Sequence, residues 1–192
     1  MDELLHALRI KGRATTDELA AALDTAPQEV EAGLRALEAD GLAIERATGR
    51  RPGWMISPAG RDAHAEQAST HVTAEVRAEI LQHYKRFLKV NDPVKEVCTI
   101  WQTTSDEERR LDLLAELRAL HDQASPVVAS TGEAIPRFAR YGDRLTAALE
   151  RAAGDPRYVV SPLVDSYHTV WFECHEDFLV TLGRNRHDEG SW

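Results

Sequence analysis

The first part of the chain alternates helical stretches with short polar turns. Apolar residues recur at helical spacing over residues 2–11, 15–23 and 25–40, which predicts three helices. The second stretch opens with Thr-Thr-Asp-Glu, the pattern of a capping box, and the third opens with Thr-Ala-Pro-Gln, which repeats that pattern around a proline in the first turn. We expect the third helix to end at Gly41.

Two short apolar runs follow, with a basic turn between them. Leu-Ala-Ile at 42–44 and Trp-Met-Ile at 54–56 predict two strands, and the Gly/Pro-rich segment at 48–53 predicts a hairpin. From Arg46 through Arg61 the sequence contains four arginines and no acidic residue. Two helices joined by a tight turn and followed by a hairpin indicate a helix-turn-helix with a wing.

Helical periodicity continues toward the C-terminus, and prolines punctuate it. Ser-Pro pairs at 57–58, 125–126 and 161–162 are expected to begin helices, because proline fits the first helical position. Asn-Asp-Pro at 91–93 is expected to break and restart a helix, and the last long helix is expected to end at Gly183. No second β region is predicted.

The predicted fold is therefore mainly α. Residues 1–66 should form an N-terminal winged helix-turn-helix with a two-stranded wing, and residues 67–192 should form an all-α C-terminal domain. No run of about 18 apolar residues occurs and the N-terminus lacks a hydrophobic signal core, so we expect a cytoplasmic protein without a membrane span. The two cysteines favour reduced thiols over a disulfide framework.

The third predicted helix has a face without acidic residues opposite its apolar face. On a helical wheel this outward side carries Thr25, Gln28 and Arg35 among alanines, and the glutamates fall on the flanks. In a DNA major groove, arginine suits guanine and glutamine suits adenine. We therefore expect this helix to supply the sequence-specific contacts of a DNA-binding domain.

The hairpin supplies the remaining predicted DNA contacts. Arg50 and Arg51 at its tip suit phosphates or a narrow minor groove, and Arg46 and Arg61 bound the acid-free stretch. The formal net charge of the whole chain is −9, so the affinity for DNA should be modest and sensitive to salt. The alternative is a winged helix used for protein contacts, with arginines that are simply solvated.

Several short motifs carry a resemblance to a known family. They are Thr-Thr-Asp-Glu-Leu-Ala at 15–20, the apolar Val30, Leu34 and Leu37 with Gly41-Leu42, Gly53-Trp54, and Ser-Pro-Ala-Gly-Arg at 57–61. Residues 2–61 thereby resemble the winged helix-turn-helix of MarR-like and related bacterial regulators, which implies a DNA-binding transcriptional regulator. MarR proteins place a dimerisation helix before this region, where the present chain leaves almost no room. A homodimer is therefore expected to form through the C-terminal helices.

The C-terminal region contains a candidate ligand site. Six residues combine flat apolar surface with polar tips, which is the mixture that a small-molecule site requires. They are Trp101, Gln102, Tyr167, His168, Trp171 and His175. The alternative is ordinary core packing, because large aromatic side chains at helical spacing usually pack in the interior. Glu173 and Asp177, from the same segment, are expected to face mainly solvent.

The histidines do not predict a metal site. His168 and His175 would be separated by about 10.5 Å along a straight helix, too far for both to ligate one ion. Asp165 and His168 have a suitable spacing for a pair, but histidines bonded to buried carboxylates fit the pattern better. No metal and no other cofactor is therefore predicted.

No catalytic motif appears, since Gly-x-Ser-x-Gly, His-Glu-x-x-His and a nucleotide-binding fingerprint are all missing, so no enzyme activity is predicted. The expected protein is a DNA-binding transcriptional regulator that binds a double-stranded DNA operator and whose helical domain dimerises and senses a small molecule. Residues 165–186 also resemble helical segments associated with PEP-utilising, pyruvate phosphate dikinase-like proteins. This second resemblance implies a regulator or accessory module of that metabolism. The alternative function is a winged-helix protein-interaction module or accessory protein of a metabolic enzyme that does not bind DNA.

Overall fold

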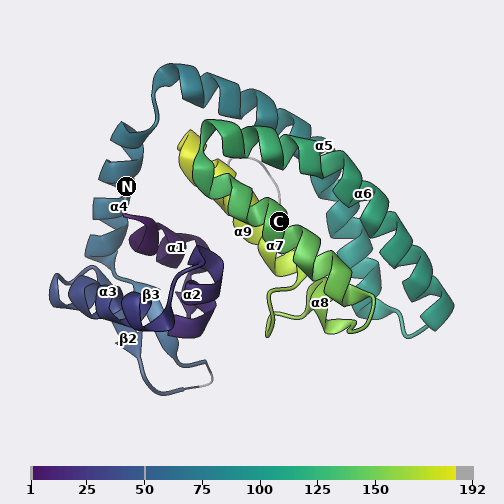
Figure 1. Cartoon of the computed structure of the whole chain (residues 1–192), viewed down its shortest axis with the longest axis horizontal. Coiled ribbons are helices and arrows are strands. Elements are labelled where there is room, and N and C mark those ends of the chain that lie inside the picture. The colour runs from purple at the N-terminus through teal and green to yellow at the C-terminus, as the bar shows by residue number, and fades with distance from the viewer. Residues whose placement is uncertain (1, 50, 185–192) are drawn as a thin grey trace. The chain divides into compact units, whose positions relative to one another are not determined.

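The computed structural model describes residues 2–49 and 51–184, apart from the side chains of residues 69–71. The described chain is mainly helical and contains a small antiparallel sheet of three strands (Figure 1). Its contacts divide it into two compact units, residues 1–73 and residues 74–192, whereas the sequence places the boundary slightly earlier. Of the helices described, none combines the length and the apolar character needed to cross a membrane.

In the first unit, helices pack around the small sheet. Its elements are α1 (Glu3–Lys11), β1 (Arg13–Ala14), α2 (Thr16–Leu23), α3 (Pro27–Ala39), β2 (Ala43–Arg46), β3 (Gly53–Ile56) and α4 (Pro58–His71). The side chains of Leu5, Leu8, Leu19 and Leu34 are fully buried, and that of Trp54 is nearly so. One apolar core therefore joins α1, α2, α3 and β3.

Local signals begin two helices of this unit where the sequence predicts. The Thr15 hydroxyl accepts a hydrogen bond from the Glu18 N–H and the Glu18 carboxylate accepts one from the Thr15 N–H, which completes the capping box. Pro58 occupies the first turn of α4. The capping box expected at Thr25 is wrong, because Ala26 is the N-cap residue of α3 and no side chain caps this helix.

The sheet has the strand order β1–β3–β2 with antiparallel pairing. The β2–β3 hairpin contains the two predicted strands, whereas β1 is only two residues long and leaves no periodicity to detect. Gly53 begins β3 with a φ of 148°, and a Cβ there would lie 2.7 Å from the carbonyl oxygen of Ala14. A Cβ at Gly60 would likewise collide with the carbonyl oxygen of Leu42. Both positions therefore require glycine.

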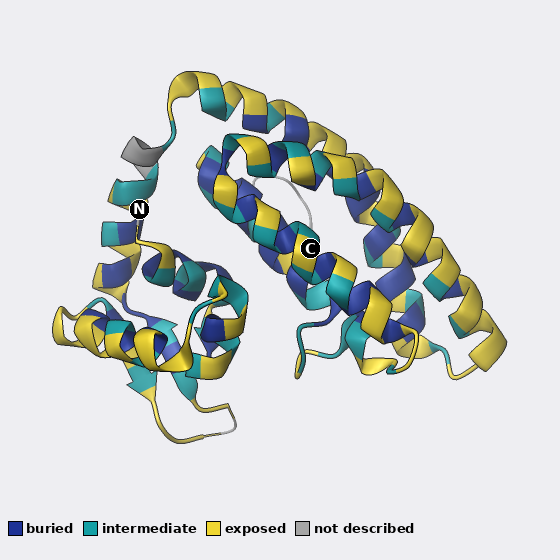
Figure 2. Cartoon of the chain, in the orientation of Figure 1, coloured by how far each residue is buried: buried dark blue, intermediate teal, exposed yellow. Residues whose placement is uncertain are grey.

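The second unit is an assembly of helices in its described part. Its elements are α5 (Ala74–Thr103), α6 (Glu107–Ala134), the 3-10 helix η1 (Pro136–Phe138), α7 (Ala139–Ala152), α8 (Arg157–Val160) and α9 (Tyr167–Leu182). The long helices α5 and α6 pack along each other, α7 packs against α6, and α9 contacts α5 and α7 (Figure 1). Buried residues form stripes along the inner sides of these helices and exposed residues cover the outer sides (Figure 2).

Two prolines lie inside the long helices. Pro93 lies within α5 and Pro126 within α6, so the expected break at Asn-Asp-Pro and the expected helix start at the second Ser-Pro pair are both wrong. A proline inside a helix removes one hydrogen bond and costs about 3 kcal/mol. Apolar burial continues across each proline, as at Val90 and Val94 in α5, and it offsets this cost.

The last helix begins later than expected and ends where expected. Ser166 is the N-cap residue of α9, and its hydroxyl accepts a hydrogen bond from the Thr169 N–H. This cap starts the helix at Tyr167 and not at Pro162. Gly183 takes the left-handed conformation and ends α9.

Candidate functional site

The helix α3 buries one side and exposes the other. Val30, Leu34 and Leu37 are buried, as the helical wheel predicts, whereas Gln28 and Arg35 are exposed. The exposed surface of the helix also includes the acidic residues Glu29, Glu38 and Asp40. Negative charge therefore lies directly beside the candidate DNA-reading residues and works against the approach of phosphates.

Arg35 is bound by three carboxylates. Its guanidinium lies 3.0 Å from Glu31, 3.1 Å from Glu38 and 2.6 Å from Glu45, and it covers the Trp54 ring at 4.7 Å from the centroid. The hydrogen bonds to Glu45 and Glu38 raise the pKa of Arg35, so the group stays charged. Since Glu45 belongs to β2, the side chain expected to read guanine ties α3 to the hairpin.

The other two predicted residues of this surface lie at the start of α3. Thr25 is half-buried, and its hydroxyl donates a hydrogen bond to the carbonyl oxygen of Leu23. This bond directs the Thr25 hydroxyl toward the preceding turn, and the hydroxyl does not cap α3. Gln28 is exposed in the first turn of the helix, where its amide is accessible to solvent.

The hairpin keeps its described arginines at the surface. Arg46 at the end of β2, Arg51 just before β3 and Arg61 in α4 are all exposed, and Arg50 lies outside the described residues. The Arg51 guanidinium lies 3.6 Å from the Glu18 carboxylate, which is a long and solvated ion pair. These three arginines therefore remain accessible to an anionic partner.

One arginine at the base of the hairpin was not predicted. Arg13 in β1 donates a hydrogen bond to the carbonyl oxygen of Arg51 at 3.0 Å, and its other guanidinium nitrogen lies 2.9 Å from the sulfur of Met55. Its only signal in the sequence is a basic residue between two helical stretches. In the structure, Arg13 supports the segment that carries Arg51.

Most residues of the predicted ligand site lie in the core of the second unit. Trp101, Tyr167, Trp171 and His175 are buried, His168 is half-buried and Gln102 is exposed. Trp171 Nε1 donates a hydrogen bond to Asn91 Oδ1 at 3.0 Å, and its ring stacks on Phe87 with centroids 4.4 Å apart. His175 Nε2 and the Tyr84 hydroxyl form a second buried hydrogen bond of 2.9 Å. These contacts join α9 to α5 and fit the core-packing alternative.

A buried carboxylate holds α9 against η1 and α7. Asp177 is fully buried, and the expectation that it faces solvent is wrong. It accepts hydrogen bonds of 2.9 to 3.1 Å from Arg137 and of 3.0 Å from the Tyr141 and Thr181 hydroxyls. Burial, followed by the charge of Asp177, raises the pKa of Tyr141 well above its ordinary value. Arg137, which lies 40 positions away in the sequence, offsets the free-energy cost of burying this carboxylate.

A second arginine network joins α7 to the start of α9. Arg144 forms two hydrogen bonds of 2.6 Å with Asp165 and an ion pair of 2.8 Å with Glu173. Glu173 is buried, so its expected exposure is also wrong. Burial opposes the charged guanidinium, but Asp165 and Glu173 together raise the pKa of Arg144. Asp165, which with His168 has the spacing of a metal-ligating pair, therefore binds Arg144 through both carboxylate oxygens.

The described residues show how the possible metal ligands and the two cysteines are placed. Within the described part of the chain, no group of three or more His, Cys, Asp and Glu side chains is arranged to hold a metal ion. Cys98 and Cys174 are both buried, and burial raises the pKa of Cys98 to about 12 and that of Cys174 well above its ordinary value. Such thiols stay protonated near neutral pH and react slowly.

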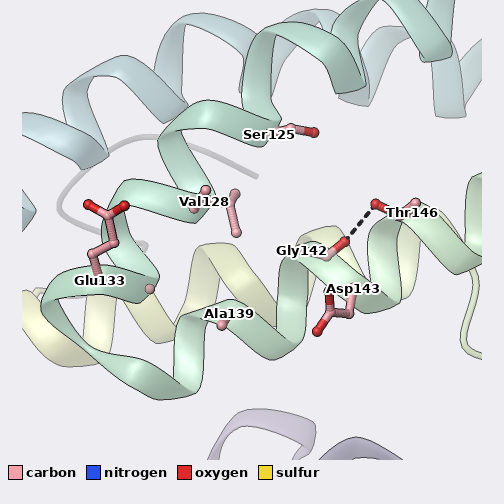
Figure 3. A pocket seen from close by; sticks show the side chains of 9 residues that line it. Ser125, Val128, Glu133, Ala139, Gly142, Asp143 and Thr146 are labelled. Atoms are coloured by element: carbon pink, nitrogen blue, oxygen red, sulfur yellow. Dashed lines mark hydrogen bonds between the residues drawn. The ribbon is translucent and has the colours of Figure 1, made fainter.

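A surface pocket of about 450 Å³ lies between α6 and α7 (Figure 3). Ser125 and Val128 on α6 face Gly142 and Thr146 on α7 across it. The six residues of the predicted ligand site are not among those that line this pocket.

Comparison with known proteins identifies no relative of this chain. No protein family, curated protein or solved structure matches it.

Proposed function

We propose that residues 1–73 form a winged helix that binds double-stranded DNA through its hairpin, within a transcriptional regulator. The observation that carries this proposal is the exposure of Arg46, Arg51 and Arg61 around a hairpin that follows a pair of helices. No acidic residue occurs between positions 46 and 61, so this segment is itself positively charged although the whole chain carries −9. Phosphate binding depends on such a local patch and not on the net charge.

In this proposal α3 contributes few base contacts. Arg35 would have to leave three carboxylates and the Trp54 ring to reach a guanine. Gln28 remains as the exposed polar side chain suited to the edge of a base. Affinity would then come mainly from phosphates, so we expect steep salt dependence and a need for two half-sites bound by a dimer.

We propose that the second unit forms this homodimer. Among its residues up to position 184, large apolar side chains are exposed at Leu111 in α6, Leu163 between α8 and α9, and Phe172 in α9. Leu163 is 84% exposed, and a second copy of the chain that covered it would remove apolar surface from water. Sedimentation equilibrium of the full chain tests this point, because a monomer at micromolar concentration would contradict it.

Removal of the hairpin charge tests DNA binding. Arg46→Ala with Arg51→Ala should weaken binding to selected genomic fragments by about tenfold or more and lower the slope of log K against log salt by about 2, since each lost phosphate contact contributes about 0.9. Fluorescence anisotropy at several salt concentrations measures both effects. Arg109→Ala with Arg157→Ala removes the same charge from exposed positions of the second unit and should leave binding nearly unchanged. Equal effects of the two variants would contradict the assignment of the hairpin.

The acidic surface of α3 favours a second candidate, a module that binds a basic protein segment. Glu29, Glu38 and Asp40 are exposed there, and Arg35 is already neutralised by its own carboxylates. Glu38→Gln with Glu45→Gln separates the two candidates, because these changes release Arg35 and remove negative charge. A DNA-binding domain should gain affinity for DNA in the anisotropy assay. A module for basic partners should instead lose affinity for an oligolysine peptide.

A further inference from the structure

We infer that the pocket between α6 and α7 binds a small organic cation, specifically an alkylamine or alkyldiamine. This inference is independent of DNA binding. The two helices approach closely at Gly132, where a Cβ would lie 3.0 Å from the main-chain nitrogen of Ala139. The adjoining space of about 450 Å³ falls within the range of about 300–1,000 Å³ that small-molecule sites occupy.

The floor of the pocket is apolar. Val128 is buried beneath it, and Ala129 and Ala139 contribute methyl groups from the two helices. A Cβ added at Gly142 would meet only a Val128 methyl at 3.8 Å, so the missing side chain leaves room at this point. Methyl surface of this kind favours the burial of an alkyl chain.

The hydroxyl groups at the pocket offer lone pairs but no protons. The Ser125 hydroxyl donates to the carbonyl oxygen of His121 at 2.8 Å, and the Thr146 hydroxyl donates to the carbonyl oxygen of Gly142 at 2.9 Å, the bond drawn in Figure 3. A hydroxyl has one proton, so both oxygens can act only as acceptors toward a ligand. A bound molecule must therefore bring its own hydrogen-bond donors.

His121 contacts both of these hydroxyl groups. Its Nε2 lies 3.1 Å from Ser125 Oγ and 3.4 Å from Thr146 Oγ1. We assign the proton of the neutral ring to Nε2, because both hydroxyl protons are directed to main-chain carbonyl oxygens, and Nδ1 then lies 3.4 Å from the Tyr167 hydroxyl as an acceptor. Burial lowers the pKa of His121, so the ring is neutral near pH 7 and does not repel a cation.

Carboxylates supply the charge that selects a cation. Glu133 on α6 and Asp143 on α7 line the pocket, one from each helix, and the lining includes no Lys, Arg or His. Both carboxylates are exposed and lie at separate points of the lining, so an ammonium group can donate to one of them while its alkyl chain covers the apolar floor. A carboxylic acid anion of the same length would be repelled, and a neutral alcohol would gain no charge attraction.

Isothermal titration calorimetry of the full chain at fixed ionic strength tests the proposal. Hexylamine and 1,4-diaminobutane should each bind at one site per chain with a Kd of roughly 0.1–1 mM, which is ordinary for a small ligand. Hexanoate and 1-hexanol, which have the same chain length as hexylamine, should give no binding heat in this range. Absence of amine binding, or equal binding of all three six-carbon probes, would overturn the proposal.

Pocket variants locate the binding. Glu133→Gln with Asp143→Asn should weaken amine binding at least about tenfold, and Ala129→Leu should block the pocket without changing the charge. Glu116→Gln with Glu150→Gln removes the same charge from exposed positions of α6 and α7 outside the pocket lining and should preserve binding. Circular dichroism verifies that each variant is folded. Retention of binding in both pocket variants, or equal loss in the control, would show that amines act only as counterions and would overturn the proposal.

Discussion

Ion pairs between arginine and carboxylate side chains occur in both units of the protein, but their environments differ. In the first unit the Arg35 side chain is 50% exposed, and its partners Glu31 and Glu38 are each 41% exposed. In the second unit the Arg137 side chain is 10% exposed and Asp177 is completely buried. The Arg35 pairs are therefore partly solvated, whereas the Arg137–Asp177 pair lies in the core.

Burial decides what such a pair contributes. An exposed pair is screened by water and salt and adds little to stability. A buried pair cannot lose one member without leaving an uncompensated charge in the interior. Arg35 therefore belongs to a partly solvated surface network, whereas Arg137 belongs to the framework of the second unit.

The largest expected effect tests the buried side of this comparison. Asp177→Asn keeps the shape of the side chain but leaves the Arg137 guanidinium without its carboxylate, so the free energy of unfolding should fall by about 3–5 kcal/mol. Urea unfolding followed by circular dichroism measures the loss. Asp155→Asn breaks the exposed pair with Arg157 in the same unit and serves as the control. Similar losses of unfolding free energy in Asp177→Asn and Asp155→Asn would show that burial does not decide what these ion pairs contribute.

A smaller effect is expected at the exposed side. Arg35→Ala should change the unfolding free energy far less than Asp177→Asn does, because all three of its carboxylates are partly solvated. The difference between wild type and variant should shrink further in about 1 M salt, where the screening length is near 3 Å. Urea midpoints at low and high salt measure both points. A large loss that persists in high salt would show that the Trp54 stacking contact, rather than the charges, stabilises this surface.

The smallest expected effect concerns acidity in the second unit. Burial lowers the pKa of both His121 and His168 below the unfolded value of about 6.5. The unfolded state then binds protons more readily, so stability is complete above about pH 6.5 and declines as the pH falls toward the folded pKa values. Urea unfolding at pH 7.5 and 5.5 should show this decline. His121→Gln with His168→Gln should reduce this loss of unfolding free energy between pH 7.5 and 5.5. A wild-type protein that became more stable at the lower pH would contradict the prediction.

Several features that depend on neighbours in sequence could be predicted, although the capping box expected at Thr25 was not among them. The capping box of Thr15 and Glu18, the proline start of α4 and the glycine end of α9 are all set within a few residues. The buried side of α3 follows from the helical period alone, as Val30 and Leu34 show. Two members of the Arg35 network, Glu31 and Glu38, also lie at helical spacing from it.

Features that depend on distant segments could not. Asp177 finds Arg137 across 40 positions of sequence, so its burial leaves no local signal. Pro93 stays inside α5 because packing on the neighbouring helices continues past it. Glu45 approaches Arg35 only after the hairpin has folded beside α3. In each case a tertiary contact overrides the local preference of the residue.

Gly53 at the start of β3 and Gly60 in α4 limit which positions in and beside the hairpin can vary in evolution. A side chain at either glycine would collide with the main chain of Ala14 or Leu42, so selection should retain both. Thr48 near the tip is exposed, and exchanges there carry little folding cost. Exposed positions such as Thr48 can therefore exchange while the same two glycines persist.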